Sequence, residues 1–160
     1  MIRFTIVAVG RLKEPYLVEA AEEYLRRLVP YARVQVHEVP EEPFPPRPSP
    51  AQSRAVREQE AARLARHIPG DGCLIALAPR GRIPSSEELA ALVEERALAG
   101  QGHLIFLVGG PLGLAPALLE RAAMVLSFSR LTFPHQLFRV ILLEQLYRVC
   151  KIVRHEPYHW

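Results

Sequence analysis

Short apolar runs alternate along this chain with segments whose apolar residues recur at helical spacing, and this alternation constrains the fold more than any other feature. Residues 3–9, 73–78 and 103–108 are rich in apolar and β-branched side chains, as strands buried on both faces are. Strands that alternate with helices favour a mainly parallel sheet flanked by helices on both faces. We therefore predict an α/β fold.

The remaining elements follow from the same spacing and from local signals. Ser85 or Ser86 begins a helix, and Ser85 with Glu88 three residues later predicts a capping box. Six prolines between residues 40 and 50 exclude a helix or central strand there and predict an extended surface loop. The predicted helices cover residues 15–28, 51–67, 85–99, 116–124 and 136–153, and the other two strands cover residues 34–39 and 125–128.

Length and composition are those of an ordinary globular chain. Because no internal repeat or long linker divides the sequence, we expect a single domain over residues 1–160. No secretory signal is visible, and the long uncharged stretch at residues 103–119 contains too many glycines and prolines for a bilayer-spanning helix. We expect a cytoplasmic protein without a membrane segment, with Cys73 and Cys150 as buried, reduced thiols.

Positive charge is concentrated toward the end of the chain. Residues 121–160 contain six Lys and Arg against two Asp and Glu, whereas residues 1–120 contain 14 against 15. A basic region on an otherwise balanced domain indicates an acidic partner, although solvated surface arginines explain the same count nearly as well.

A glycine-rich loop, Gly109-Gly110-Pro111-Leu112-Gly113, follows a predicted buried strand and precedes a helix. In open α/β sheets ligands bind beyond the carboxyl ends of strands, and glycine lets the backbone approach a ligand closely. The loop lacks the Gly-Lys-Ser/Thr of a phosphate-binding loop and does not match GxGxxG. From the residues alone it is either a cofactor loop or a tight structural turn.

Residues 128–135 join the last predicted strand to the last helix and combine hydroxyl groups, Arg130 and aromatic rings that can enclose a flat base. His135 suits a capping or packing role as well as a catalytic one. The helix that follows is apolar almost all round, so it is either central to the core or covered by a second subunit, and we favour a dimer interface. Arg148 stands four residues after Glu144 and can pair with it.

The tail from His155 to His159 reads HExxH, the signature in which one helical face presents two histidines to zinc. Pro157 lies between the histidines and disfavours that helix. We therefore predict no metal site.

Several motifs, in this order, are similar to those of the ribosomal RNA large subunit methyltransferase H family, which belongs to the SPOUT superfamily. The opening segments Val7-Ala8-Val9-Gly10 and Glu23-Tyr24-Leu25-Arg26-Arg27 are similar too, so the resemblance extends over essentially the whole chain. The motifs are Leu107-Val108-Gly109-Gly110-Pro111-Leu112-Gly113-Leu114, Leu126-Ser127-Phe128-Ser129-Arg130-Leu131-Thr132-Phe133-Pro134-His135, Arg139-Val140, Leu146-Tyr147-Arg148 and Pro157-Tyr158-His159.

This resemblance implies an enzyme that uses S-adenosylmethionine to methylate N3 of a pseudouridine in helix 69 of 23S ribosomal RNA. It also implies a homodimer and a SPOUT-type fold with a C-terminal trefoil knot, which the residue pattern alone would not suggest. The RNA partner is expected within the assembled ribosome. The family's cofactor contacts, largely made by the backbone, fall on Leu77, Gly109, Phe128, Ser129, Arg130, Leu131, Thr132 and Phe133.

The catalytic residues are inferred from the chemistry of the expected reaction. The pseudouridine N3 must lose its proton, and a general base helps such a step by about 10²–10⁴-fold. His159 is the first candidate for this base and His135 the second, while Tyr158 orients the target base and Arg148 holds a phosphate. Alternatively, solvent removes the proton and the tail only positions RNA.

Three positions depart from the family pattern. Leu112 stands where members often have glutamate, residues 43–50 are proline-rich where some relatives are lysine-rich, and Trp160 ends the chain where a basic residue is common. Rival interpretations are a non-catalytic RNA-binding module, a Rossmann-type nucleotide enzyme and a zinc hydrolase. A Rossmann enzyme requires a glycine fingerprint after the first strand, and residues 7–11 lack it.

Overall fold

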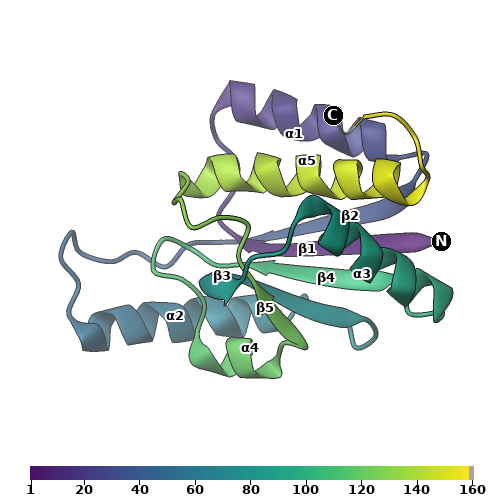
Figure 1. Ribbon diagram of the computed structural model, residues 1–160. Coiled ribbons are helices and arrows are strands. Elements are labelled where there is room, and N and C mark those ends of the chain that lie inside the picture. The colour runs from purple at the N-terminus through teal and green to yellow at the C-terminus, as the bar shows by residue number, and fades with distance from the viewer. Residues whose placement is uncertain (159–160) are drawn as a thin grey trace.

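The computed structural model describes residues 1–158, in which five parallel strands form one sheet with the order β2-β1-β4-β3-β5 (Figure 1). This arrangement confirms the predicted α/β class with a parallel sheet. The strands are β1 (Ile2–Val9), β2 (Ala32–Val39), β3 (Cys73–Arg82), β4 (His103–Val108) and β5 (Met124–Leu126). The helices are α1 (Pro15–Leu28), α2 (Pro50–Ala65), α3 (Ser86–Leu98), α4 (Pro116–Arg121) and α5 (His135–Val153).

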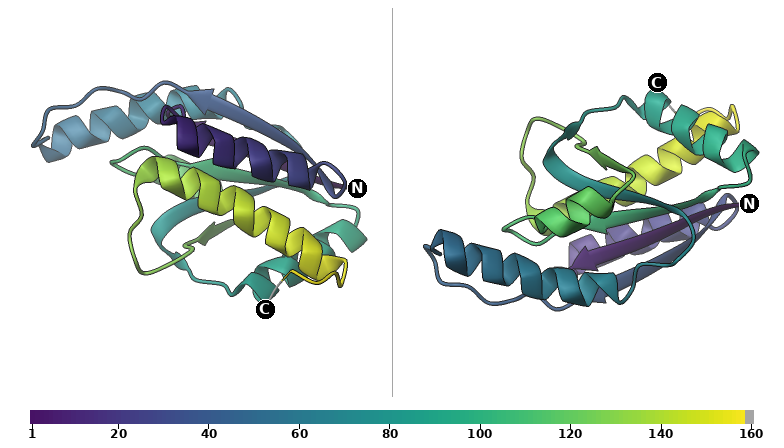
Figure 2. Two further views of the ribbon diagram at one scale, coloured as in Figure 1. Left: turned by 90° about the horizontal axis from the view of Figure 1, so that it is seen from above. Right: turned by 90° about the horizontal axis from the view of Figure 1, so that it is seen from below.

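Helices cover both faces of the sheet, which explains why its central strands are apolar at nearly every position. Helices α1, α3 and α5 lie on one face, and α2 and α4 lie on the other (Figures 1 and 2). Alternate residues of β1 divide between the two layers, because Phe4 and Ile6 pack toward α5 whereas Val7 and Val9 pack toward α2. Every residue of β4 is buried.

Helix α5 lies between α1 and α3 in its layer, directly over the sheet (Figure 2). Leu142, Leu146 and Val149 have no exposed surface, so a large part of the helix's apolar surface is covered within the chain. Of the two explanations for an apolar α5, a helix central to the core therefore explains the apolar residues on the face toward the sheet. Leu137 in the first turn stays 38% exposed, and a second subunit remains a prediction.

Strand β3 is longer than the sequence predicted. It continues beyond Ala78 to Arg82, and both Leu77 and Arg82 pair with Leu126 of β5 through an irregularity in the ladder. The carbonyl of Arg82 also accepts a hydrogen bond from the backbone of Ser127 at 2.8 Å. The extension, Pro79-Arg80-Gly81-Arg82, is mostly exposed and has no run of apolar side chains, so the apolar pattern gave no sign of it.

The other boundaries differ by a few residues for local reasons. The amide of Ala123 donates to the carbonyl of Leu74 at 2.8 Å, which brings the chain to the sheet edge early and ends α4 before residue 124. The capping box at Ser85 is confirmed. Ser49 forms a second box with Gln52, and α2 consequently begins at Pro50. Both cysteines are free and buried, as predicted. Within residues 1–158, no helix is long and apolar enough to cross a membrane.

Gly81 is where the extended part of β3 meets β5. A Cβ atom there would lie 2.5 Å from the carbonyl carbon of Leu126 and 2.8 Å from its Cα atom, and backbone atoms cannot move aside as a side chain can. The close approach of β3 to the end of β5 therefore depends on the absence of a side chain at Gly81.

We expect Gly81→Ala to lower the free energy of unfolding by roughly 2–3 kcal/mol, because overpacking against backbone forces strain or displacement. Gly70→Ala is the matched control, since a Cβ at Gly70 meets nothing within 4 Å, and its effect should stay within about 0.5 kcal/mol. Urea denaturation followed by circular dichroism measures both. Equal stability of the two variants would contradict the proposed close approach of Gly81 to the backbone of Leu126.

Candidate functional site

A cavity of about 550 Å³ lies at the carboxyl edge of the sheet. Its walls are the end of β3 from Leu77, the glycine loop after β4 and the segment after β5, with His135 and Phe138 contributed by α5. The structure thus brings together around one space all the residues predicted to contact a cofactor. They are Leu77, Gly109, Phe128, Ser129, Arg130, Leu131, Thr132 and Phe133.

The glycine loop is a tight turn as well as a cavity wall. The amide of Gly113 donates to the carbonyl of Gly110 at 2.9 Å, and Gly113 has a positive φ of 85°. A Cβ on Gly109 would lie 2.8 Å from the carbonyl carbon of Gly113 and 3.0 Å from the amide nitrogen of Leu114. The two interpretations of the loop are therefore compatible, because the turn itself presents main chain to the cavity.

The segment after β5 is held by its own hydroxyl groups. The Ser127 hydroxyl donates to the carbonyl of Ser129 at 2.9 Å, and the Ser129 hydroxyl accepts from the amide of Leu131 at 2.9 Å. The Phe128 ring packs edge-on against Phe138 of α5, with 5.5 Å between ring centroids. These contacts give the segment a defined shape, with an apolar wall on the side of the two rings.

Few charges line the cavity. Arg130, which is exposed, and His135 are the titratable side chains in its wall, and the described lining residues include no Asp or Glu. A ligand with several phosphates would find no lysine or arginine cluster within this wall. The cavity instead offers main chain, hydroxyl groups and apolar surface.

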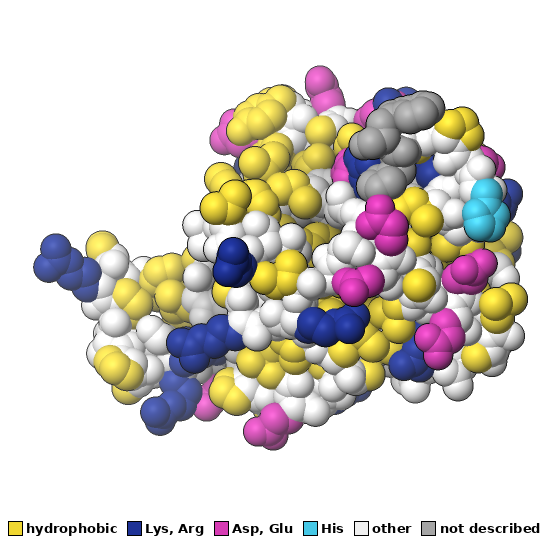
Figure 3. Space-filling model, in the orientation of Figure 1, with side chains coloured by type: hydrophobic (Ala, Val, Ile, Leu, Met, Phe, Trp, Pro, Cys, Tyr) yellow, Lys and Arg dark blue, Asp and Glu magenta, His cyan; other side chains and the backbone are white. Residues whose placement is uncertain are grey.

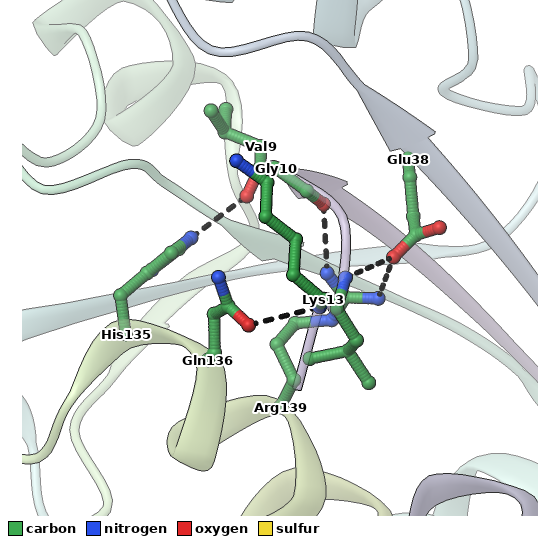
Figure 4. Close-up of polar contacts among 8 residues, drawn as sticks. Val9, Gly10, Lys13, Glu38, His135, Gln136 and Arg139 are labelled. Atoms are coloured by element: carbon green, nitrogen blue, oxygen red, sulfur yellow. Dashed lines mark hydrogen bonds and ion pairs between the residues drawn. The ribbon is translucent and has the colours of Figure 1, made fainter. Parts of the chain in front are cut away.

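The first turn of α5 holds His135 at the edge of the cavity and joins it to the end of β1 (Figure 4). His135 Nε2 lies 2.7 Å from the carbonyl oxygen of Val9. Because a carbonyl only accepts, Nε2 carries a proton, and Nδ1 of the neutral ring is left as an acceptor. Gln136 extends the same junction, since its side-chain oxygen accepts from the amide of Lys13 at 3.1 Å.

Arg139, one turn later, is buried and fixes the loop that follows β1 (Figure 4). Its guanidinium donates to the carbonyl of Gly10 at 3.0 Å and to the carboxylate of Glu38 at 2.9 Å. A buried arginine is stable only when such partners compensate its lost hydration. The start of α5, the end of β1 and β2 are therefore bound into one unit beside the cavity.

The other two described catalytic candidates lie farther along the chain, Arg148 on α5 and Tyr158 after the end of that helix. Arg148 pairs with Glu144 at 2.5 Å, as its spacing predicted, and its guanidinium lies 4.8 Å from the centre of the Tyr158 ring. The Tyr158 hydroxyl donates to Glu144 at 3.2 Å. Burial, with the nearby Glu144 charge as a smaller cause, raises the pKa of Tyr158 to about 12, so the phenol is neutral near pH 7.

Neither Arg148 nor Tyr158 lines the cavity of this chain. Their shared partner Glu144 stands nine positions after His135, which corresponds to about 13 Å along the helix axis. His159, the first candidate for the general base, lies outside the described residues. The structure therefore brings His135 to the cavity and separates it from Arg148 and Tyr158.

The tail does not have the conformation that the zinc signature requires. Helix α5 ends at Val153, and His155 has a positive φ of 54°. Glu156 accepts hydrogen bonds from the Lys151 ammonium at 2.6 Å and the Tyr31 hydroxyl at 2.5 Å, so its carboxylate is already engaged. Among residues 1–158 no three His, Cys, Asp or Glu side chains are placed to share a metal ion.

One residue beside the site was missed by the sequence analysis. Glu60 is only 2% exposed and lies on α2 behind the glycine loop. The available signal was its position between Val56 and Leu64, four residues from each, on the buried stripe of the helix. An acidic residue on such a stripe is uncommon, because carboxylates are rarely buried without a partner.

Comparison with known proteins identifies close relatives of this sequence. Residues 2–159 match the family described as "Predicted SPOUT methyltransferase". The chain is 52% identical over 160 residues, 100% of both chains, to a protein of Pelotomaculum thermopropionicum named ribosomal RNA large subunit methyltransferase H. Proteins of the same name from Moorella thermoacetica and Desulforamulus reducens are 52% and 48% identical over 159 residues, 99% of each chain.

We expect Arg139→Leu to destabilise the protein by about 3 kcal/mol, because it leaves the Gly10 carbonyl and the Glu38 carboxylate without their partner. Arg26→Leu removes an arginine from an exposed ion pair and should cost less than about 1 kcal/mol. Urea denaturation compares the two variants. A loss in Arg139→Leu no larger than that of the control would show that the buried bridge does not hold this junction.

Proposed function

We infer the function of this chain from the family to which it belongs, which is the SPOUT methyltransferase family and, within it, the ribosomal RNA large subunit methyltransferase H family. We propose that the chain transfers a methyl group from S-adenosylmethionine to N3 of a pseudouridine in helix 69 of 23S ribosomal RNA. The observation that carries the proposal is the cavity whose walls contain every expected cofactor contact. We further propose that residues 1–160 act as one domain in the cytoplasm, with the knotted C-terminal region of SPOUT proteins.

The cavity suits S-adenosylmethionine in size and chemistry. Its volume of about 550 Å³ is within the usual range for small-molecule sites. The apolar wall at Phe128 and Phe138 suits a flat base, and the main chain of Gly109 and of residues 128–133 offers hydrogen-bonding groups at close range. The absence of a cationic cluster in the described wall agrees with a ligand that has no phosphate. When bound, this cofactor supplies an already activated methyl group.

The protein's part in the reaction is then to align the target base and to accept its proton. His135 can accept a proton at Nδ1 while Nε2 holds the Val9 carbonyl. His159 remains the first candidate for the general base. Tyr158 is neutral near pH 7, as tyrosines ordinarily are, and its raised pKa makes a phenolate base still less available. We therefore propose that it orients the base and does not take the proton.

We propose a homodimer in which the tail of one subunit approaches the cavity of the other. Tyr158 and Arg148 are held on α5 away from their own chain's cavity, so the site of one chain lacks them. Apolar side chains are also exposed at the cavity rim and in the first turn of α5. Leu131 and Phe133 of the cavity wall are 75% and 37% exposed, and Leu137 of α5 is 38% exposed. Figure 3 displays apolar surface over the first turns of α1 and α5.

Exposed arginines around the cavity support an RNA partner. Arg130 lines the cavity, Arg80 follows its wall at β3, and Arg47 and Arg54 lie on the loop before α2 and on α2 itself. Lys and Arg side chains lie along the projecting side of the molecule that carries this loop (Figure 3). We propose that they contact phosphates of ribosomal RNA in the assembled ribosome, so that activity weakens as salt rises. A non-catalytic RNA-binding module would instead bind RNA without any affinity for the cofactor.

The proposed reaction is tested by incubating the protein with labelled S-adenosylmethionine and ribosomes that lack the modification, followed by mapping of the labelled nucleotide. We expect label at N3 of one pseudouridine in helix 69. Gly109→Ala should lose at least tenfold in cofactor affinity, because the new Cβ displaces the turn, while Gly70→Ala should behave like the native protein. Label at another nucleotide, or none with a folded native protein, would reject the assignment.

The base is tested by His159→Ala and His135→Gln in single-turnover reactions across a range of pH. We expect His159→Ala to slow methyl transfer by about 10²–10⁴-fold and to abolish the rise in rate with pH that a titrating base gives. Near-native rates for His159→Ala at every pH would exclude His159. Loss of the same profile only in His135→Gln would move the role to His135.

A further inference from the structure

Glu60 is a buried carboxylate with incomplete hydrogen bonding. It is 2% exposed, and its Oε2 accepts from the amide of Glu42 at 3.1 Å. Its Oε1 has no hydrogen-bond partner among the described residues. A charged oxygen removed from water without a partner is costly, and such groups in folded proteins call for an explanation.

The carboxylate lies directly behind the wall of the cavity. A Cβ atom on Gly110 would lie 3.0 Å from Oε1 and 3.1 Å from Oε2 of Glu60, and Gly110 itself lines the cavity. The backbone of Gly110 therefore lies between this carboxylate and the cavity. A side chain at position 110 would have to push the carboxylate away.

The groups around Glu60 leave its charge largely uncompensated. Glu41 and Glu42 are acidic, and the guanidinium of Arg63 is bound to Glu42 and to the carbonyl of Pro40. Arg63 and, from α5, His135 also act on the carboxylate, but both lower its pKa less than burial raises it. Burial is the main cause of a raised pKa for Glu60. A positive charge in the cavity would supply the compensation that the protein itself does not provide.

We propose that Glu60 is the counter-charge for a cationic ligand in the cavity and that it makes the site prefer S-adenosylmethionine to its demethylated product. The inference rests on the proposed function. S-adenosylmethionine carries a sulfonium methyl group and its positive charge, both of which S-adenosylhomocysteine lacks, while the rest of the two molecules is the same. The described wall residues include no acid, so Glu60 supplies the negative potential through the backbone of the glycine loop.

The expected size of the effect follows from Coulomb's law. A unit charge on the order of 10 Å away, at an effective dielectric constant of about 20, changes a binding constant by about tenfold. Glu60→Gln keeps the shape of the side chain and the acceptor for the Glu42 amide, and removes the charge. We expect it to weaken S-adenosylmethionine by about tenfold and to leave S-adenosylhomocysteine within about twofold.

The same charge should couple cofactor binding to pH. A bound cation lowers the raised pKa of Glu60, so binding releases a proton from the fraction of protein in which Glu60 is protonated. Affinity for S-adenosylmethionine should therefore rise with pH more steeply than affinity for the product. His135, Glu41, Glu42 and Arg63 also lie near Glu60, and Arg57 of the same helix donates to the Leu112 carbonyl of the glycine loop at 3.5 Å. The difference between the native protein and Glu60→Gln separates the pH dependence due to Glu60 from that of these groups.

Isothermal titration calorimetry with each of the two compounds tests the inference without any measurement of activity. Glu58→Gln is the matched control, because it removes the same charge from an exposed position of α2. Glu60→Leu is a second variant in case the amide destabilises the fold, since an apolar side chain of similar size is tolerated where an unpaired buried carboxylate is costly.

The inference is supported if both Glu60 variants lose the preference for S-adenosylmethionine and Glu58→Gln retains it. An equal loss of affinity for both compounds, or an unchanged preference, would overturn it while leaving the proposed function intact. If the folded native protein bound neither compound, the proposed function would fail and the inference with it.

Discussion

Close contact between backbone segments at the carboxyl edge of the sheet is the constraint on which the site depends. Gly81 of β3 lies against the backbone of Leu126, and Gly109 lies against the turn at Gly113, so neither position has room for a side chain. These contacts bring the chain after β3, β4 and β5 around one space. The cavity is consequently walled by main chain and apolar surface, which favours a ligand recognised by shape and hydrogen bonds over one held by ion pairs.

Helix α5 begins at the cavity, and its later turns hold Tyr158 at a distance from that cavity. Its first turns bind the end of β1 through His135 and Arg139, and its later turns bind Tyr158 through Glu144. A single helix thus holds His135 at the cavity and keeps Arg148 and Tyr158, the other described candidates, away from it. This geometry is the physical basis for proposing that two chains complete each other's sites.

The sequence predicted the fold class and most elements, because strands buried on both faces and amphipathic helices leave clear periodic patterns. It did not predict the extension of β3, since Pro79-Arg80-Gly81-Arg82 contains no run of apolar side chains and its pairing depends on Leu126, which is distant in sequence. The cofactor residues were expected through family resemblance, and the structure places them around one cavity. Glu60 was missed although it lies on the buried stripe of α2, because its proximity to Gly110 joins segments that are distant in sequence.

The central claim is that the glycine loop and the segment after β5 enclose an adenosyl cofactor. A crystal structure of the protein grown with S-adenosylmethionine tests it most directly. The account predicts density between residues 109–113 and 128–133, with the base against the Phe128 wall and the sulfonium on the side of Gly110 that faces away from Glu60. Cofactor density in another part of the molecule, with this cavity vacant, would contradict it.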